Sequence, residues 1–301
     1  MRFILYLTNK SRPANPDTAS GHWSTVAGIL GREHGVKVAQ DICMVRLKAF
    51  IKGTWREKGG RQPATKRHAM SPHKLRRAMN LCLDINDKDS VNLRALLTCG
   101  IQFLARGSEL GRGDKKTWKA ASGITRDDLK LSKNKQSLHI MLAAAKGKSL
   151  GGKDCPVTVG SGGRLIDAVA EVINLEKVDP LEGEERKTTP AFRNEKGVAF
   201  SVNEISRWIK KLMKAIGESV VGYSSHSLRI GGATALYTAG VDPLVIMMMG
   251  RWSSDCYQRY IRGDVNLAMR VSSTIGSTKL SPEDEVFRRL EEFDIGSDYE
   301  N

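Results

Sequence analysis

The order of apolar and polar positions divides the chain into helical segments and one short region of alternation. Residues 90–105 are apolar nearly all round, which is typical of a helix in the middle of a core. Between 124 and 160 the pattern changes, and LHIMLAAA and CPVTVG predict two strands joined by the turn KGKSLGGKD. Apolar residues at helical spacing predict further helices over 18–32, 38–52, 164–177 and 202–216. The expected class is mainly α with one small antiparallel β-sheet.

One helix in the last third begins and ends with recognisable signals. Ser224 or Ser225 is expected to cap a helix that runs to about residue 239 and stops at Gly240. Gly231 and Gly232 lie inside it, where each costs about 1 kcal/mol. Either the close approach of another backbone or ordinary packing explains them.

Proline and glycine mark the ends of other helices. Ser71-Pro72 predicts a cap followed by proline at the first helical position. Asp242 and Pro243 predict the start of a further helix, which Gly250 ends. The methionine run within it is expected to fill the core.

The charge of the chain is strongly positive and unevenly spread. The whole chain carries +15, but residues 281–301 hold eight acids and two arginines, so the first 280 residues carry +21. Such a field suits a polyanion, of which nucleic acid is the commonest. Five scattered cysteines without a CxxC pair argue against a disulfide framework or a zinc site, and no run approaches the length of a membrane span. We therefore expect an intracellular protein that lies with DNA and away from membranes.

A basic stretch separates two helical regions. Residues 52–77 contain nine Lys or Arg and one acid, and their glycines and Pro63 break any helix. A charge run of this kind is either a solvated loop or a DNA contact. The candidate DNA-binding residues are Lys52, Arg56, Lys58, Arg61, Lys66 and Arg67.

The segment from 224 to 262 carries the most specific chemistry. His226 and Arg229 are three residues apart, so they share one face of the first turn of their helix. The positive end of the helix dipole lies at the same place, and together they would hold a phosphate. Trp252 follows in the sequence Gly-Arg-Trp and, taken alone, is better explained as a core aromatic. Tyr257 and Tyr260 then share a helix face, so both can point inward.

This ordered set resembles the tyrosine recombinases, also called phage-type integrases. The matching residues are His226-x-x-Arg229, then Trp252, then Tyr260 within Tyr-Ile-Arg. Two upstream motifs of the family are also present. Arg106 and Glu109 occur in ARGSEL after the apolar segment, and a lysine of the strand turn is supplied by Lys146, with Lys148 as an alternative.

The resemblance implies site-specific DNA cleavage and rejoining through a covalent 3′-phosphotyrosine, without ATP, metal or other cofactor. Arg106 and Arg229 would grip the non-bridging phosphate oxygens. His226 would accept the proton of Tyr260, with Tyr257 as the alternative nucleophile. Lys146 would protonate the leaving 5′-hydroxyl, Trp252 would donate its indole N–H to the phosphate, and Glu109 would orient its neighbours.

The expected organisation is an abbreviated helical core-binding domain over 1–68, a catalytic domain over 69–275 and an acidic tail or helix over 276–301. The partners implied are double-stranded DNA and three further copies of the chain in a synaptic tetramer. Two alternatives stay open: a DNA-binding protein of recombinase descent without activity, and a type IB topoisomerase-like enzyme that relaxes DNA.

Overall fold

The computed structural model describes residues 67–114, 116–142, 155–252, 257, 258, 260 and 261, and scattered residues of the N-terminal region (21, 22, 25, 26, 28, 29, 32–35, 49 and 53). The chain divides into two compact units, Met1–Lys66 and Arg67–Asn301. In the first unit the described residues between 21 and 34 are helical, as are 49 and 53, and most of the two helices expected there lies outside the described residues. No described helix is both long and apolar enough to cross a membrane.

The second unit is mainly helical with one small sheet, as the apolar pattern predicts. Its first helices are α4 (Pro72–Cys82), α5 (Lys88–Gln102) and the short α6 (Gly107–Leu110). The later ones are α7 (Ala168–Val178), α8 (Gly183–Thr188), α9 (Val202–Ala215), α10 (His226–Thr238) and α11 (Pro243–Gly250). A 3-10 turn, η1 (Arg126–Asp128), precedes the sheet.

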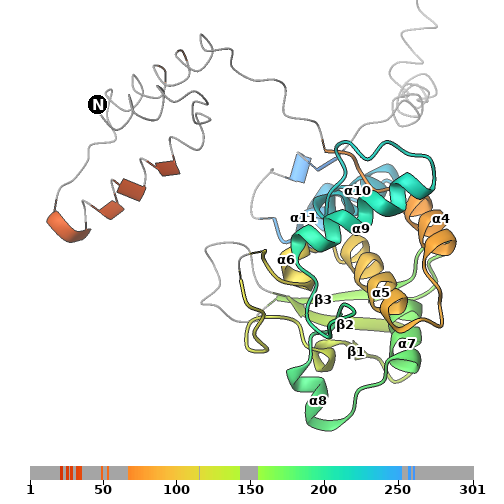
Figure 1. Cartoon of the computed structure of the whole chain (residues 1–301). Coiled ribbons are helices and arrows are strands. Elements are labelled where there is room, and N and C mark those ends of the chain that lie inside the picture. Colours follow the sequence, from red (N-terminus) through yellow and green to blue (C-terminus); the bar gives the residue numbers. More distant parts are fainter. Residues whose placement is uncertain are drawn as a thin grey trace, which may run out of the picture. The chain divides into compact units, whose positions relative to one another are not determined.

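The core is built around α5, which is buried over 91–101. It packs against α7 and α10, and Figure 1 shows it running between the two. The expected start of α4 is confirmed, because the Ser71 hydroxyl accepts from the backbone N–H of Lys74 at 3.2 Å with Pro72 at the first position. Helices α4 and α9 pack against each other.

The sheet is antiparallel with strand order β1-β2-β3, and its strands are β1 (Lys130–Leu131), β2 (Ser137–Leu142) and β3 (Cys155–Gly160). The register of the last two pairs Ser137 with Gly160 and Leu142 with Cys155. Leu138, Ile140 and Leu142 are buried and alternate with more exposed residues, so the sheet has one face on the core, beside α7. The two expected strands are confirmed, and β1 is an addition.

Helix α10 shows why two adjacent glycines lie inside it. A Cβ atom on Gly231 would lie 1.8 Å from the carbonyl oxygen of Met70, and one on Gly232 would lie 2.2 Å from that of Ile101. Both glycines therefore permit close approach of another backbone, one of the two explanations that the sequence left open. The cap differs from expectation. Ser225 is the cap residue but makes no side-chain capping bond, and the Ser227 hydroxyl instead accepts from the Ser224 N–H at 3.0 Å.

Helix α11 begins and ends as the sequence predicts, with the Asp242 carboxylate accepting from the Leu244 N–H at 2.7 Å and Gly250 as the last residue. The expectation that its methionines fill the core is wrong for Met248, which is 70% exposed. The helix is only eight residues long and lies at the surface, so only Ile246 and Gly250 are buried in it.

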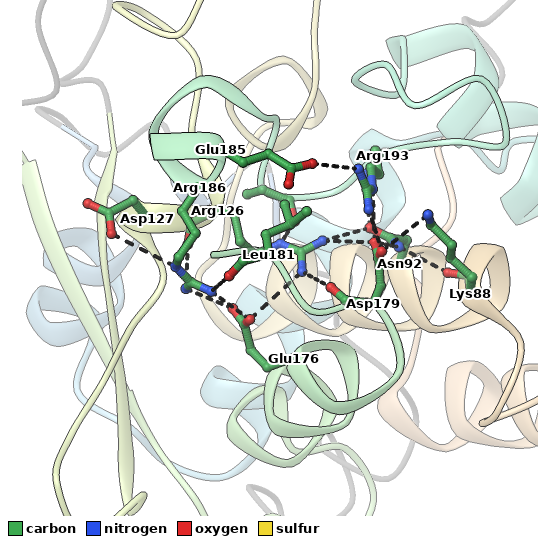
Figure 2. A network of polar contacts seen from close by, with 11 residues as sticks. Lys88, Asn92, Arg126, Asp127, Glu176, Asp179, Leu181, Glu185, Arg186 and Arg193 are labelled. Carbon is green, nitrogen blue, oxygen red and sulfur yellow. Dashed lines mark hydrogen bonds and ion pairs between the residues drawn. The ribbon is translucent and has the colours of Figure 1, made fainter. Parts of the chain in front are cut away.

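A buried polar network joins η1, the end of α7 and α5 (Figure 2). The Arg126 side chain is fully buried and contacts Asp179 at 3.2 Å and the Ala191 carbonyl at 2.9 Å. Arg193 and Asn92 also bind the Asp179 carboxylate. The network fastens the chain around 179–193 to α5.

Candidate active site

Helix α6 fixes the first arginine of the site. The Glu109 carboxylate accepts from the backbone N–H of Arg106 at 2.7 Å and also binds its guanidinium. The Glu109 side chain is nearly buried, whereas 29% of the Arg106 side chain is exposed. The N-terminus of α6 abuts that of α10, because a Cβ on Gly107 would lie 2.9 Å from Ser225. Arg106 is thereby held beside the helix that carries His226.

The second arginine, Arg229, is completely buried in α10. Its two terminal nitrogens donate to the carbonyls of Leu104 and Gly250, so it ties the end of α5 to the end of α11. Burial lowers the pKa of Arg229 to about 10, and the positive charges of Arg106 and Arg251 act in the same direction. This pKa is still about three units above neutral pH, so the guanidinium stays charged there.

Two aromatic rings lie over the Arg229 guanidinium, and a third packs on one of them. The guanidinium carbon lies 4.3 Å from the centre of the Trp252 ring and 5.4 Å from that of Tyr260. The Tyr260 ring lies 4.9 Å from the Trp252 ring and 5.0 Å from the His226 ring, measured between centroids. Its backbone carbonyl accepts from the Thr234 hydroxyl at 3.1 Å, which attaches this turn to α10. Cation–π attraction and hydrogen bonding together hold Tyr260 at the site.

The two candidate tyrosines differ in their surroundings. Both are half-buried and pack against the small cluster of Leu104, Ala233, Ile246 and Trp252. Among the described residues, the ring contacts to His226 and Trp252 come from Tyr260 and none from Tyr257. The geometry thus favours Tyr260 over Tyr257 as the tyrosine that faces the proposed base.

A third arginine enters the site that the sequence did not single out. Arg251, buried at the C-cap of α11, binds the Glu109 carboxylate at 2.7 Å and donates to the carbonyls of Phe103 and Met249 at 3.2 and 3.3 Å. Its φ of 54° lies in the left-handed region, as does that of Leu104 at 48°. For a residue with a side chain this costs roughly 1–2 kcal/mol. The signal available in the sequence was an arginine directly between Gly250 and Trp252.

Several buried donors of the site have no hydrogen-bond partner among the described residues. They are Nε of Arg229, Nε of Arg251 and Nε1 of Trp252. An unsatisfied buried donor costs about 1–3 kcal/mol, and more when it is charged. The unpaired N–H groups of Arg229 and Trp252 fit an anion that accepts hydrogen bonds.

Not all of the expected site residues are among those that the structure describes. Lys146 and its alternative Lys148 lie outside the described residues, between β2 and β3. The candidate DNA-binding residues Lys52, Arg56, Lys58, Arg61 and Lys66 also lie outside them, and Arg67 is described and exposed. The structure therefore brings together Arg106, Glu109, His226, Arg229, Trp252 and Tyr260, and adds Arg251.

Comparison with solved structures finds the same fold in DNA recombinases. The integrase of transposon Tn1549, in complex with circular intermediate DNA, matches with a TM-score of 0.51 and 12% identity, over 90% of this chain and 82% of that one. The site-specific recombinase XerH, bound to palindromic difH substrate in a post-cleavage complex, matches with a TM-score of 0.50 and 16% identity, over 73% of this chain and 55% of that one. No protein-family model and no curated protein matches the sequence.

The chain therefore has the fold of the tyrosine recombinases, mostly helical with a small three-stranded antiparallel sheet, as the resemblance implied. At these identities the likeness concerns the fold.

Proposed function

We propose that this chain cuts and rejoins double-stranded DNA at specific sites by transesterification through Tyr260. The observation that carries the proposal is the cluster around Tyr260, whose ring lies against His226 and Trp252 and over the Arg229 guanidinium. A phenol, a base and cations meet there in one small volume. These are the groups that phosphoryl transfer to a tyrosine requires.

The arginines account for binding and charge stabilisation. A phosphodiester attacked by a side-chain oxygen gains negative charge on its non-bridging oxygens, and guanidiniums stabilise that charge at any relevant pH. Arg106 is the partly exposed guanidinium and Arg229 the buried one. The unpartnered Nε of Arg229 and Nε1 of Trp252 would donate to the same oxygens.

The tyrosine needs activation, because at its reference pKa near 10 only about one phenol in a thousand is ionised at pH 7. His226 is the proposed proton acceptor, since its ring is the basic group packed on Tyr260. Attack by the Tyr260 oxygen on phosphorus expels the 5′-oxygen, and Lys146 is proposed to protonate it. The phosphotyrosyl bond keeps the energy of the broken bond, so rejoining needs neither ATP nor metal.

The partners proposed are two DNA duplexes held by a tetramer of this chain, in the intracellular compartment that contains the DNA. Residues 1–68 are proposed as the core-binding domain and 69–275 as the catalytic domain. The two recombinases of similar fold were solved with DNA, which supports this choice of partner.

The test is the capture of the covalent intermediate. Nicked duplexes tiled across the DNA that flanks the gene lose a short fragment when cleaved, which traps the protein on the 3′-phosphate. We expect an adduct that survives SDS and maps to Tyr260, and we expect Tyr260→Phe to abolish it. Tyr257→Phe is the matched control and should retain it.

The outcomes separate the alternatives. An adduct retained by Tyr260→Phe and lost by Tyr257→Phe would move the nucleophile and leave the function intact. DNA binding without any adduct would favour the inactive descendant. Relaxation of supercoils at any sequence by a monomer would favour a topoisomerase-like enzyme.

A further inference from the structure

Arg251 is placed in a way that ordinary packing does not require. Its backbone is held in the left-handed region at φ 54°, directly after Gly250 ends α11. Lys135 has the same conformation but lies exposed in a remote turn. Strained backbone at a buried, charged residue is found where the surrounding contacts fix it for function.

The contacts of Arg251 converge on the segment that carries Arg106. On one side of Arg106 the guanidinium donates to the Phe103 carbonyl at 3.2 Å. On the other side it binds Glu109 Oε2 at 2.7 Å, and the same oxygen accepts from the Arg106 backbone N–H at 2.7 Å. Arg251 therefore holds both flanks of Arg106, and within the described part of the chain its side-chain partners are the Glu109 carboxylate and the carbonyls of Phe103 and Met249.

The charges around Glu109 also connect Arg251 to Arg106. Glu109 is nearly buried and also binds the Arg106 guanidinium through its other oxygen. Without Arg251 this carboxylate would have Arg106 as its only cationic partner among the described residues. It would then compete with a phosphate for the guanidinium that the reaction needs.

We propose that Arg251 is a positioning residue of the strand-transfer site, which holds Glu109 and the turn at Phe103 so that the Arg106 guanidinium remains available to the scissile phosphate. The inference rests on the proposed function. It assigns Arg251 no contact with DNA, because its effect passes through Arg106.

The experiment measures the single-turnover rate of adduct formation on the nicked duplex for Arg251→Gly. Glycine accepts the left-handed backbone, so the change removes the guanidinium without adding strain. We expect the rate to fall about 100-fold, which equals about 2.7 kcal/mol in the activation free energy. The Kd for the duplex should change by less than about twofold, because Arg251 is buried. Lys135→Gly, which relieves the same conformation at a remote turn, should leave the rate unchanged.

Repeating the measurement in the Arg106→Ala protein distinguishes a positioning role from a general loss of structure. In the Arg106→Ala protein, Arg251→Gly should lower the rate further by less than about threefold, because the residue through which it acts is already gone. An equal fall in both backgrounds, or a wild-type rate for Arg251→Gly, would overturn the inference while the wild-type adduct still supports the proposed function. Absence of the wild-type adduct overturns both. If Arg251→Gly does not fold, the isosteric Glu109→Gln must show the same dependence on Arg106.

Discussion

At the scale of single residues, the site is built from side chains whose hydrogen-bonding capacity is only partly used. The Trp252 ring lies directly on Gly250, where a Cβ would be only 1.9 Å from the ring. Its indole N–H is buried and has no partner among the described residues, while its face stacks on Arg229. A tryptophan that only filled the core would usually satisfy this donor. The unpaired donor of Trp252 therefore favours a role in phosphate binding over core packing alone.

Removing this single donor gives a prediction. We expect Trp252→Phe to lower the rate of adduct formation by roughly 10- to 100-fold, the equivalent of one hydrogen bond to a charged group. Trp252→His keeps a ring donor and should recover most of the loss. Single-turnover adduct assays on both variants, with melting temperatures as a check on folding, decide the question. Equal rates for the two variants would assign Trp252 to packing alone.

At the scale of elements, the sequence predicts those helices whose periodicity or end signals are strong. The caps at Ser71 and Asp242 and the buried α5 are in place. The short elements α6 and α8 and the strand β1 were not predicted, because a few polar residues show no period. The expected helix at 164 begins at Ala168 instead, after Asp167 caps it.

Two buried arginines were not predicted, because short segments without periodicity give no signal of burial. Arg251 lies at the C-cap of α11 and the fully buried Arg126 in the 3-10 turn η1, and their partners are 142 and 53 residues away respectively. Burial of an arginine depends on which carbonyls and carboxylates the fold brings around it. Composition and periodicity do not contain that information. The motif residues were predictable because their order along the chain is itself a signal.

The network in Figure 2 gives a prediction about acid stability. Burial alone would raise the pKa of Asp179, but hydrogen bonds from Arg193 and Asn92 and the charges of Arg193 and Arg126 outweigh it and hold the pKa well below its usual range. A lowered pKa in the folded state means that Asp179 stabilises the fold above its unfolded pKa of about 3.9. This stability is lost progressively as the pH falls below about 4.

We therefore expect Asp179→Asn to lower the free energy of unfolding at pH 7 by about 3 kcal/mol, because Arg126 stays buried without its closest opposing charge. The variant should also show a smaller further loss between about pH 5 and pH 2 than the wild type. Asp127→Asn, which removes more exposed pairs with Lys130 at 3.0 Å and Arg186 at 4.0 Å, is the control and should cost less than about 1 kcal/mol. Urea unfolding at several pH values measures both. The same acid dependence in Asp179→Asn and wild type would contradict the assignment.

At the scale of the whole molecule, the excess of positive charge is the dominant feature. The +21 of the first 280 residues is separated along the sequence from the −6 of the last 21. Contacts to DNA phosphates release bound counterions, so affinity falls steeply with salt when such contacts dominate.

We expect the Kd for duplex DNA to rise on the order of 10³-fold between 50 and 200 mM salt, as for a protein with about six phosphate contacts. Fluorescence anisotropy with a labelled duplex measures the slope of log Kd against log salt. The control is a duplex of unrelated sequence, for which the slope should be similar although the affinity is lower. A flat response would show that phosphate contacts contribute little.

The segment that enters the second unit has a consequence for shortened versions of this protein. The backbone N–H groups of His68 and Met70 donate to the carbonyls of Gly222 and Ser227 at 3.1 and 2.9 Å, and the His68 ring stacks on Tyr223. His68 and Met70, which precede α4, thus contact the start of α10 and the segment directly before it. A chain that begins at the helix itself would lose both hydrogen bonds and expose Gly231, whereas one that begins at residue 67 keeps them. A shortened chain should therefore begin several residues before Pro72, where α4 starts.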